Sequence, residues 1–224
     1  MIIIFHHNRN VKPCYVYDTE AKMLDNMLNE FYSIGKSLSS EMDPLKLFEK
    51  IVNSSMKLTS ADGCTVYIVI DKKTGEWSHV EDSSARDKLL KFVIARNTSM
   101  EVNLQDFTAP ISQKSISGYT VISGKSLLID DAYLIGDHAE YRHSRSFDKS
   151  TGYRTKSILS IPMKDHNNYI TGVIQLINKK RSWDAKIDYK RKDVADEILP
   201  FNGTDELIMN SLAGLSLGFS ENIS

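Results

Sequence analysis

Apolar residues recur every three or four positions near the N-terminus of the chain, and this spacing predicts an amphipathic helix. Five residues follow it: Leu24, Met27, Leu28, Phe31 and Ile34. We assign the N-terminal helix to residues 20–42 and treat residues 1–19 as an N-terminal arm, because Pro13 disfavours a helix there.

Three further helices are predicted, over residues 43–59, 116–124 and 204–222. Asp43 is the expected N-cap of the first, because its side chain can accept a hydrogen bond from a free backbone N–H group. Thr204 is the expected N-cap of the last, where two acidic residues follow it and favour the positive end of the helix dipole.

Between these helices the pattern changes to short runs rich in β-branched and aromatic residues, which predict strands. The runs lie at residues 64–71, 88–97, 126–134, 157–165 and 169–180. The sequence DHNN, residues 165–168, joins the last two as a hairpin turn. Hairpins favour an antiparallel sheet, and the helices at both ends of the chain can cover one face of it, so the fold class is α+β.

Composition narrows the range of functions. The formal net charge of -1 and the pI near 6.6 provide no general attraction to nucleic acid or to a membrane surface. No segment has the length and hydrophobicity of a membrane span, so we expect a cytoplasmic protein. The segment 179–193 is dense in charge and is interpreted as a solvated loop.

The sequence gives little evidence for a metal site or a redox site. His138 and His143 lie near two acidic residues in a polar loop, but they lack a recognised ligand spacing, so no metal site is predicted. Cys14 and Cys64 are far apart, and Cys64 lies in an apolar strand run where a buried small residue is expected.

The C-terminal third carries a spaced motif. INKK, a variable loop and FNGTDE supply five residues: Asn178, Lys179, Phe201, Asp205 and Glu206. This arrangement resembles the NKFDE signature of GAF domains in cyclic-nucleotide phosphodiesterases and cyanobacterial adenylyl cyclases. The segment FDKSTGYRTKSILSIPM, residues 147–163, resembles the loop that precedes a strand in the same subfamily. We therefore expect a GAF domain over residues 43–224, including its C-terminal helix.

The resemblance implies a fold and a ligand. The expected fold has a central antiparallel sheet of about six strands, with the N- and C-terminal helices on one face and a ligand pocket on the other. The expected ligand is a cyclic nucleotide, cAMP or cGMP, bound as a regulatory molecule, and no cofactor is implied. In the family, the cyclic phosphate lies at the N-terminus of a short helix, where free N–H groups favour negative charge.

Matching each position to the family gives nine candidate ligand-binding residues: Thr65, Arg96, Ile116, Ser117, Tyr141, Asp148, Thr151, Thr155 and Gln175. Asp148, Thr151 and Thr155 would form the inner face of a lid, and Gly152 would permit its turn. Gly118 would allow close approach of the backbone to the phosphate. The five motif residues would instead support the pocket, with Lys179 paired to Asp205 and Phe201 packed beneath.

The chain lacks the sequence signatures of a nucleophile elbow, a P-loop or a metal phosphodiesterase, so we expect a sensor and not an enzyme. The resemblance implies a homodimer formed through the terminal helices, and an output enzyme domain that lies outside this chain. Two alternatives stay open: a GAF module that dimerises without a ligand, and a GAF sensor of another small molecule.

Overall fold

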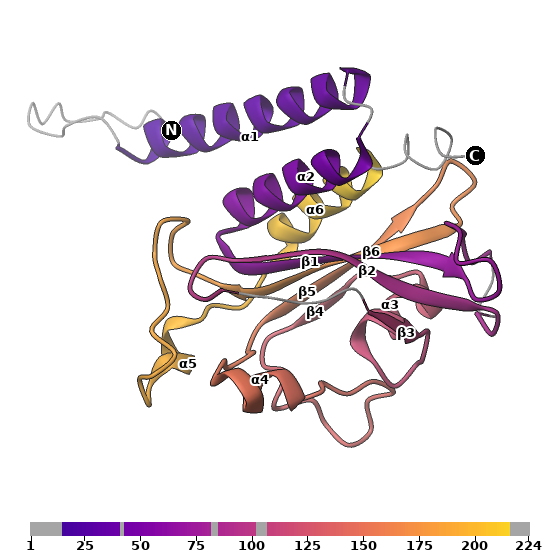
Figure 1. The fold of residues 1–224 in the computed structure, drawn as a ribbon. Coiled ribbons are helices and arrows are strands. Elements are labelled where there is room, and N and C mark those ends of the chain that lie inside the picture. The colour runs from indigo at the N-terminus through magenta and orange to yellow at the C-terminus, as the bar shows by residue number, and fades with distance from the viewer. Residues whose placement is uncertain (1–14, 41–42, 82–84, 102–106, 216–224) are drawn as a thin grey trace, which may run out of the picture.

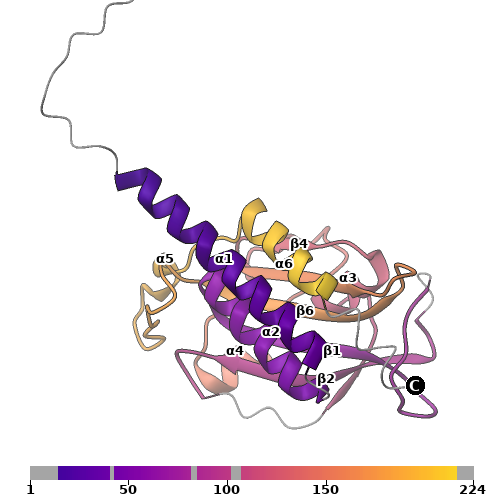
Figure 2. The ribbon, with the colours of Figure 1, turned by 90° about the horizontal axis from the view of Figure 1, so that it is seen from above.

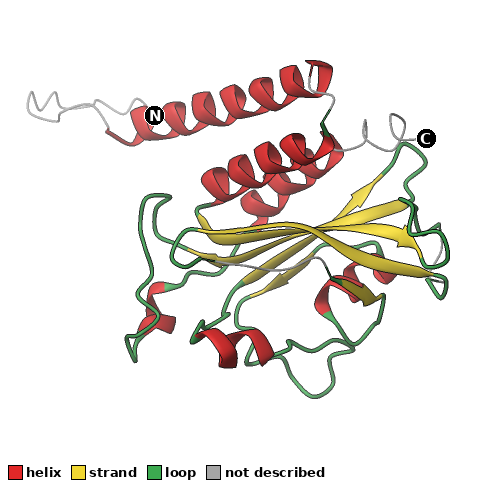
Figure 3. Cartoon of the chain, in the orientation of Figure 1, coloured by secondary structure: helices red, strands yellow, loops and turns green. Residues whose placement is uncertain are grey.

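The computed structural model describes residues 15–40, 43–81, 85–101 and 107–215 (Figure 1). The elements follow in this order: α1 (Tyr15–Ser40), α2 (Pro44–Thr59), β1 (Ala61–Asp71), β2 (Lys88–Asn97), β3 (Thr108–Pro110), α3 (Ile116–Ser123), β4 (Leu127–Ile129), α4 (Ser146–Thr151), β5 (Ile158–Lys164), β6 (Ile170–Lys179), α5 (Val194–Glu197) and α6 (Gly203–Leu215). The α+β class predicted from the sequence is confirmed (Figure 3).

One six-stranded sheet forms the centre of the molecule, in the order β3-β2-β1-β6-β5-β4. Every neighbouring pair is antiparallel. The long strands β1 and β6 lie side by side in the middle, where Thr65 is opposite Gln175. Because side chains alternate between the faces of a strand, these two residues share a face.

Helices α1, α2 and α6 lie over one face of the sheet, and α3 and α4 lie on the other side (Figures 1 and 2). The larger apolar core fills the space between the sheet and α2 and α6. It includes Phe48 and Ile51 from α2, Cys64 from β1 and Leu212 from α6, all nearly inaccessible to solvent. Cys64 is buried, as expected, and burial raises the pKa of its thiol well above the ordinary value.

The start of α1 differs from the expectation. The helix begins at Tyr15, so the last five residues assigned to the N-terminal arm are helical. Apolar spacing marks the part of a helix that packs on a core, and it carries no signal where the helix extends beyond that core. Figure 2 shows this end of α1 projecting past the sheet. The arm residues before Tyr15, including Pro13 and Cys14, lie outside the described residues.

The capping prediction holds for α2 and is wrong for α6. Asp43 accepts a hydrogen bond from the backbone N of Leu45 at 2.9 Å. At α6, Asn202 is the N-cap: its Oδ1 accepts from the backbone N of Thr204 and Asp205, and Asp205 in turn accepts from the backbone N of Asn202. This reciprocal pair is a capping box built from an amide and a carboxylate. The part of the predicted helix beyond Leu215 lies outside the described residues.

Three short elements were not predicted: β3, α4 and α5. The interpretation of residues 179–193 as a solvated loop is only partly right, since Lys180 and Ile187 are buried. Lys180 Nζ donates to Thr98 Oγ1 at 2.8 Å and to the Trp183 carbonyl at 2.8 Å. These two hydrogen bonds satisfy the Lys180 ammonium group and so offset the cost of burying it. The many charged residues of the segment had predicted exposure to solvent.

Within the described ranges, none of the helices combines the length and apolarity needed to cross a membrane.

Candidate ligand-binding site

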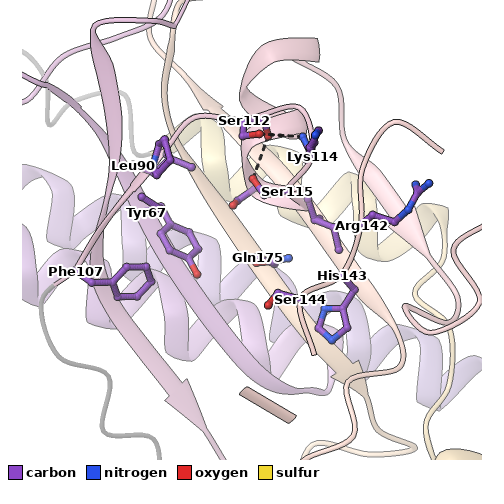
Figure 4. A pocket seen from close by; sticks show the side chains of 14 residues that line it. Tyr67, Leu90, Phe107, Ser112, Lys114, Ser115, Arg142, His143, Ser144 and Gln175 are labelled. Atoms are coloured by element: carbon purple, nitrogen blue, oxygen red, sulfur yellow. Dashed lines mark hydrogen bonds between the residues drawn. The ribbon is translucent and has the colours of Figure 1, made fainter. Parts of the chain in front are cut away.

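A cavity of about 510 Å³ opens on the sheet face opposite α1, α2 and α6 (Figure 4). This volume lies within the usual range for small-molecule sites. One wall carries the aromatic rings of Tyr67 from β1 and Phe107 beside β3. The opposite wall is formed by the start of α3 and by residues 142–144, and Gln175 of β6 lies between the two walls.

The start of α3 gives one end of the cavity a positive character. Ser115 is the N-cap and accepts a hydrogen bond from Gly118 N at 3.1 Å. The predicted residues Ile116 and Ser117 both line the cavity beside this helix end. Lys114 and Arg142 line it as well, and Arg142 N donates to the Lys114 carbonyl at 2.9 Å. The Arg142 guanidinium donates to the carbonyls of Asp137, Ala139 and Tyr141, so it is held by its own loop. Lys114 and the helix N-terminus are therefore the groups at this end that favour an anionic ligand.

The structure requires a glycine at position 118 for a reason other than the expected approach of a phosphate. A Cβ atom at this position would lie 2.6 Å from the backbone N of Ser112, closer than any real contact. Glycine is required because the first turn of α3 packs against the backbone of the preceding loop. Its hydrogen atom keeps the N-cap turn compact and positions Ser117 at the cavity.

Asp148 lies in the segment from α4 to the entry of β5, here called the lid, and is almost fully buried. Its carboxylate accepts hydrogen bonds from Thr155 N at 2.9 Å, Thr155 Oγ1 at 2.7 Å and the Tyr133 hydroxyl at 2.9 Å. His143 Nε2 lies 3.3 Å from Asp148 Oδ2. Burial acts to raise the pKa of Asp148, but the hydrogen bonds from His143, Thr155 and Tyr133 outweigh it and hold this pKa below its ordinary value. The carboxylate is therefore charged and committed to the protein.

The three expected lid contacts thus serve the lid itself. Thr155 is buried against Asp148, and Thr151 is exposed with its hydroxyl donating to the Phe147 carbonyl at 2.8 Å. Gly152 has φ of 75° and ends α4, as its expected role in the turn requires. None of Asp148, Thr151 and Thr155 lines the cavity; His143, which precedes the lid, lines it and is oriented by Asp148.

Arg96 lies on the other face of the sheet. Its guanidinium contacts Glu49 of α2 at 2.9 Å, on the side where the helices pack. β2 shifts its register against β1 between Val66 and Tyr67, and a shift of one residue reverses the face to which a strand residue points. The structure therefore does not bring Arg96 to the cavity.

Tyr141 and Thr65 lie close to the cavity without lining it. The Tyr141 ring is 4.9 Å from the ring of Tyr119 on α3, so it packs against the helix. Thr65 is buried beside Gln175, on the cavity face of the sheet. Of the nine candidates, the structure therefore places Ile116, Ser117 and Gln175 in the cavity wall and Thr65 next to it.

Asn178 connects β6 to the lid. It is fully buried with φ of 59°, and its side chain accepts from Lys156 N at 2.7 Å and donates to the Arg154 carbonyl at 2.8 Å. It also donates to the Tyr189 hydroxyl at 2.9 Å. An asparagine tolerates the left-handed backbone better than most residues, and its amide fixes the segment that leads from the lid into β5.

The remaining motif residues connect β6 to α6. Lys179 Nζ and Asp205 form the expected ion pair, and Phe201 is buried in the core beneath the sheet. Glu206 N donates to the Asn202 carbonyl at 3.0 Å, in the first turn of α6. None of the five motif residues lines the cavity.

A second polar cluster holds the lid to β1. The carboxylate of Asp62 is buried and accepts from the hydroxyls of Tyr153 at 3.0 Å and Tyr189 at 2.8 Å. Tyr153 follows the lid helix, and Tyr189 belongs to the charged loop after β6. The two rings pack with their centroids 4.1 Å apart. This cluster links three segments that are distant in the sequence.

The sequence did not single out Tyr67, Phe107 or His143 as ligand contacts. Tyr67 lies in a strand-like run where alternation assigns it to a face, but alternation does not show that the face is hollow. His143 had been considered only as a metal ligand. Among the described residues there is no group of three His, Cys, Asp or Glu side chains that could hold a metal ion.

Comparisons with known proteins agree with this architecture. A sequence model described as the GAF domain matches residues 43–191. The dual 3',5'-cyclic-AMP and -GMP phosphodiesterase 11 of Drosophila melanogaster is 28% identical over 176 residues, which are 78% of this chain and 11% of that protein. The dual 3',5'-cyclic-AMP and -GMP phosphodiesterase 11A of Takifugu rubripes is 30% identical over 192 residues, which are 85% of this chain and 20% of that protein.

Solved structures show the same fold at low identity. A methyl-accepting chemotaxis protein fragment, residues 122 to 287, has a TM-score of 0.57 at 15% identity and covers 84% of this chain and 96% of the fragment. The GAF domain of the Acinetobacter phosphoenolpyruvate-protein phosphotransferase has a TM-score of 0.55 at 12% identity, covering 89% of this chain and 94% of that one. The chain therefore has a GAF fold.

Proposed function

The chain belongs to the GAF domain family, and from this premise we propose that it is a cytoplasmic regulatory sensor that binds cAMP or cGMP in the cavity. One observation carries the proposal: the two ends of the cavity differ in chemistry. Lys114 and the start of α3 supply positive charge at one end, and Tyr67 with Phe107 supplies aromatic surface at the other. A cyclic nucleotide pairs one anionic phosphate with one flat base, so it matches both ends.

The role we propose is regulatory and not catalytic. The similar phosphodiesterases are named for cyclic AMP and cyclic GMP, but the chain spans only about a tenth to a fifth of their length. Catalysis in such proteins would then belong to another part of the polypeptide, and an output domain of this kind would receive the signal. Ligand binding shifts a receptor toward the arrangement that binds it more tightly, and the helices α1 and α6 are the proposed route to the output.

Thermal unfolding with added nucleotide tests the proposal. At a ligand concentration about a hundredfold above Kd, binding adds about 2.7 kcal/mol to the free energy of unfolding. For a domain of this size that raises Tm by roughly 5 °C or more. We expect cAMP, cGMP or both to produce this shift; no shift at millimolar concentration of either would contradict the proposal.

A charge-reversal pair makes the same test specific to the cavity. Lys114→Glu places a negative charge beside the start of α3, so the nucleotide-induced rise in Tm should fall or vanish. Lys125→Glu makes the same charge change on an exposed residue that does not line the cavity, so the rise should persist. If both variants lost the nucleotide-induced rise in Tm equally, the effect would come from the net charge of the protein and not from a site at Lys114.

An exposed apolar face on α1 supports a homodimer as part of the proposal. Leu24, Leu28 and Tyr32 are 52%, 56% and 73% exposed and recur every four residues, so they form one stripe. Met27, Phe31 and Ile34 of the same helix face the core instead. The same stripe favours the second candidate function, a GAF module that dimerises without a ligand.

Light scattering tests the pairing. Leu24→Glu with Leu28→Glu should convert a dimer of the parent chain to a monomer, because charge on the stripe opposes apolar contact. Leu134→Glu is the matched control, since Leu134 is 79% exposed and far along the chain from α1. A parent chain that is monomeric at every concentration would overturn the dimer.

A further inference from the structure

Three polar side chains on the cavity face of the sheet have no hydrogen-bond partner within the described part of the chain. They are Thr65 and Tyr67 of β1 and Gln175 of β6. Tyr67 and Gln175 are half-buried, and the fully buried unpaired side-chain atoms of the described residues belong to Ser55 and Trp77, so these three groups are open to the cavity. A ligand in the cavity can therefore bond them without breaking a hydrogen bond within the protein. Ser160 and Thr120 on the same face are paired with each other instead, 2.8 Å apart.

The surroundings of the Tyr67 hydroxyl keep it protonated. The ring is packed edge-on against Phe92 and Phe107, with centroids 6.1 Å and 6.4 Å away. Burial raises the pKa of Tyr67 to about 12, so the hydroxyl keeps its proton at neutral pH. It is therefore a neutral group that can both donate and accept one hydrogen bond.

The direction of the side chains joins them into one surface. In Figure 4 the Tyr67 hydroxyl and the Gln175 amide point into the same open space, from neighbouring strands. Phe107 stands at the edge of this space, and both aromatic residues line the cavity. The unpaired groups thus face a volume large enough for a ligand and lie away from the positive end at α3.

We propose that Tyr67 is a ligand contact, whose hydroxyl bonds the edge of the nucleotide base together with Gln175 and Thr65. The inference rests on the proposed function and adds a residue that neither the sequence motif nor the lid identifies. The ligand class it implies is a flat heterocycle with adjacent donors and acceptors on its edge. A hydroxyl and an amide can each donate or accept, so this surface accepts both an adenine and a guanine edge.

The test compares Tyr67→Phe with Tyr169→Phe by calorimetric titration of cAMP and cGMP. Tyr67→Phe removes one oxygen and keeps the ring, so Kd should rise about fivefold to tenfold for the better ligand. Tyr169 does not line the cavity; its ring stacks on His79 at 4.9 Å, and its loss of a hydroxyl should leave Kd unchanged.

A ligand-free measurement separates a binding role from a structural one. Because the Tyr67 hydroxyl has no partner among the described residues, Tyr67→Phe should leave the Tm of the free protein unchanged or raise it. A lower Tm in the free protein would overturn the inference. So would an unchanged Kd for a nucleotide that the parent chain binds. If the parent chain binds neither nucleotide, the proposed function fails and the inference fails with it.

Discussion

Asp148 accepts two hydrogen bonds from Thr155, one from the backbone N at 2.9 Å and one from the hydroxyl at 2.7 Å. The pair closes the lid segment on itself, from α4 to the entry of β5. The same carboxylate lies 3.3 Å from His143, which reaches the cavity wall. The lid is therefore a preorganised unit, and Asp148 acts on the cavity through His143.

Asp148→Asn should lower the free energy of unfolding by about 2 kcal/mol at pH 7, because hydrogen bonds to a buried charged acceptor are stronger than those to a neutral amide. Equilibrium denaturation with urea measures this difference. Thr151→Ala is the control: Thr151 is exposed, and its hydroxyl donates to the Phe147 carbonyl and accepts from Tyr153 N at the end of α4, with no charged partner, so the loss should be smaller. Equal losses in the two variants would show that the hydrogen bonds to Asp148 stabilise the fold no more than the Thr151 hydroxyl does.

The pH dependence of the same variant has a defined sign. The pKa of Asp148 in the folded protein lies below its ordinary value of 3.8. Its stabilising contribution is therefore fully present above the unfolded pKa and is lost as the pH falls through the folded value. The stability difference between the parent and Asp148→Asn should accordingly be constant near neutrality and shrink below about pH 4. A difference that grows on acidification would contradict this sign.

Substitution at Asn178 separates backbone strain from side-chain bonding. Asn178→Ala loses the bonds to Lys156, Arg154 and Tyr189 and keeps the left-handed backbone, so it should cost about 3 kcal/mol or more. Asn178→Gly loses the same bonds but adopts φ of 59° readily, so it should be about 1 kcal/mol more stable than the alanine variant. Denaturation of the two variants side by side measures the difference, and equal stability would exclude the strain.

Lys179 and Asp205 should behave as a coupled pair. Their side chains are 18% and 5% exposed, so Lys179→Met leaves a buried carboxylate without its cation and should cost about 3 kcal/mol. The double variant Lys179→Met with Asp205→Asn removes both charges and should be more stable than the sum of the two single losses predicts. A double-mutant cycle by urea denaturation measures this coupling, and strict additivity would contradict it.

Gln175→Glu should change the choice between the two nucleotides. A carboxylate only accepts hydrogen bonds, and guanine offers two adjacent donors on its edge, whereas adenine offers one donor beside an acceptor. We expect the ratio of Kd for cAMP to Kd for cGMP to rise by about tenfold, which is about 1.4 kcal/mol. Titration of both nucleotides gives the ratio; an unchanged ratio would place Gln175 away from the base.

The fold class could be predicted from the sequence because the patterns that indicate its helices and strands are local. The apolar spacing of α2, the β-branched run of β1 and the hairpin between β5 and β6 each lie within a short window. The Asp43 cap was predicted for the same reason. The α6 cap was assigned to Thr204 in place of Asn202, since both residue types cap helices and only the chain direction of the preceding loop distinguishes them.

The cavity was only partly accessible, because its wall depends on register and on distant contacts. Ile116, Ser117 and Gln175, which the resemblance gave as ligand contacts, line the cavity. Arg96 was not, because the register shift against β1 moves it to the helix face, where it pairs with Glu49. Asp148 and Thr155 do not line the cavity, because the buried Asp148 carboxylate needs hydrogen-bond donors and Thr155 supplies them within the lid.

Arg96→Ala should therefore leave nucleotide binding unchanged. The Arg96–Glu49 pair is about half exposed on both sides, so its loss should cost less than about 1 kcal/mol of stability. Titration of this variant beside Lys114→Glu compares a cation on the helix face with one at the cavity. A large loss of affinity in Arg96→Ala would contradict the placement of β2.

Isothermal titration of the parent chain with cAMP and with cGMP tests the central claim most directly. Binding of at least one nucleotide is expected, with one site per chain and an affinity that Tyr67→Phe reduces while Arg96→Ala preserves it. Absence of heat for both nucleotides at millimolar concentration, confirmed at a second temperature, would contradict the proposal that this cavity is a cyclic-nucleotide site.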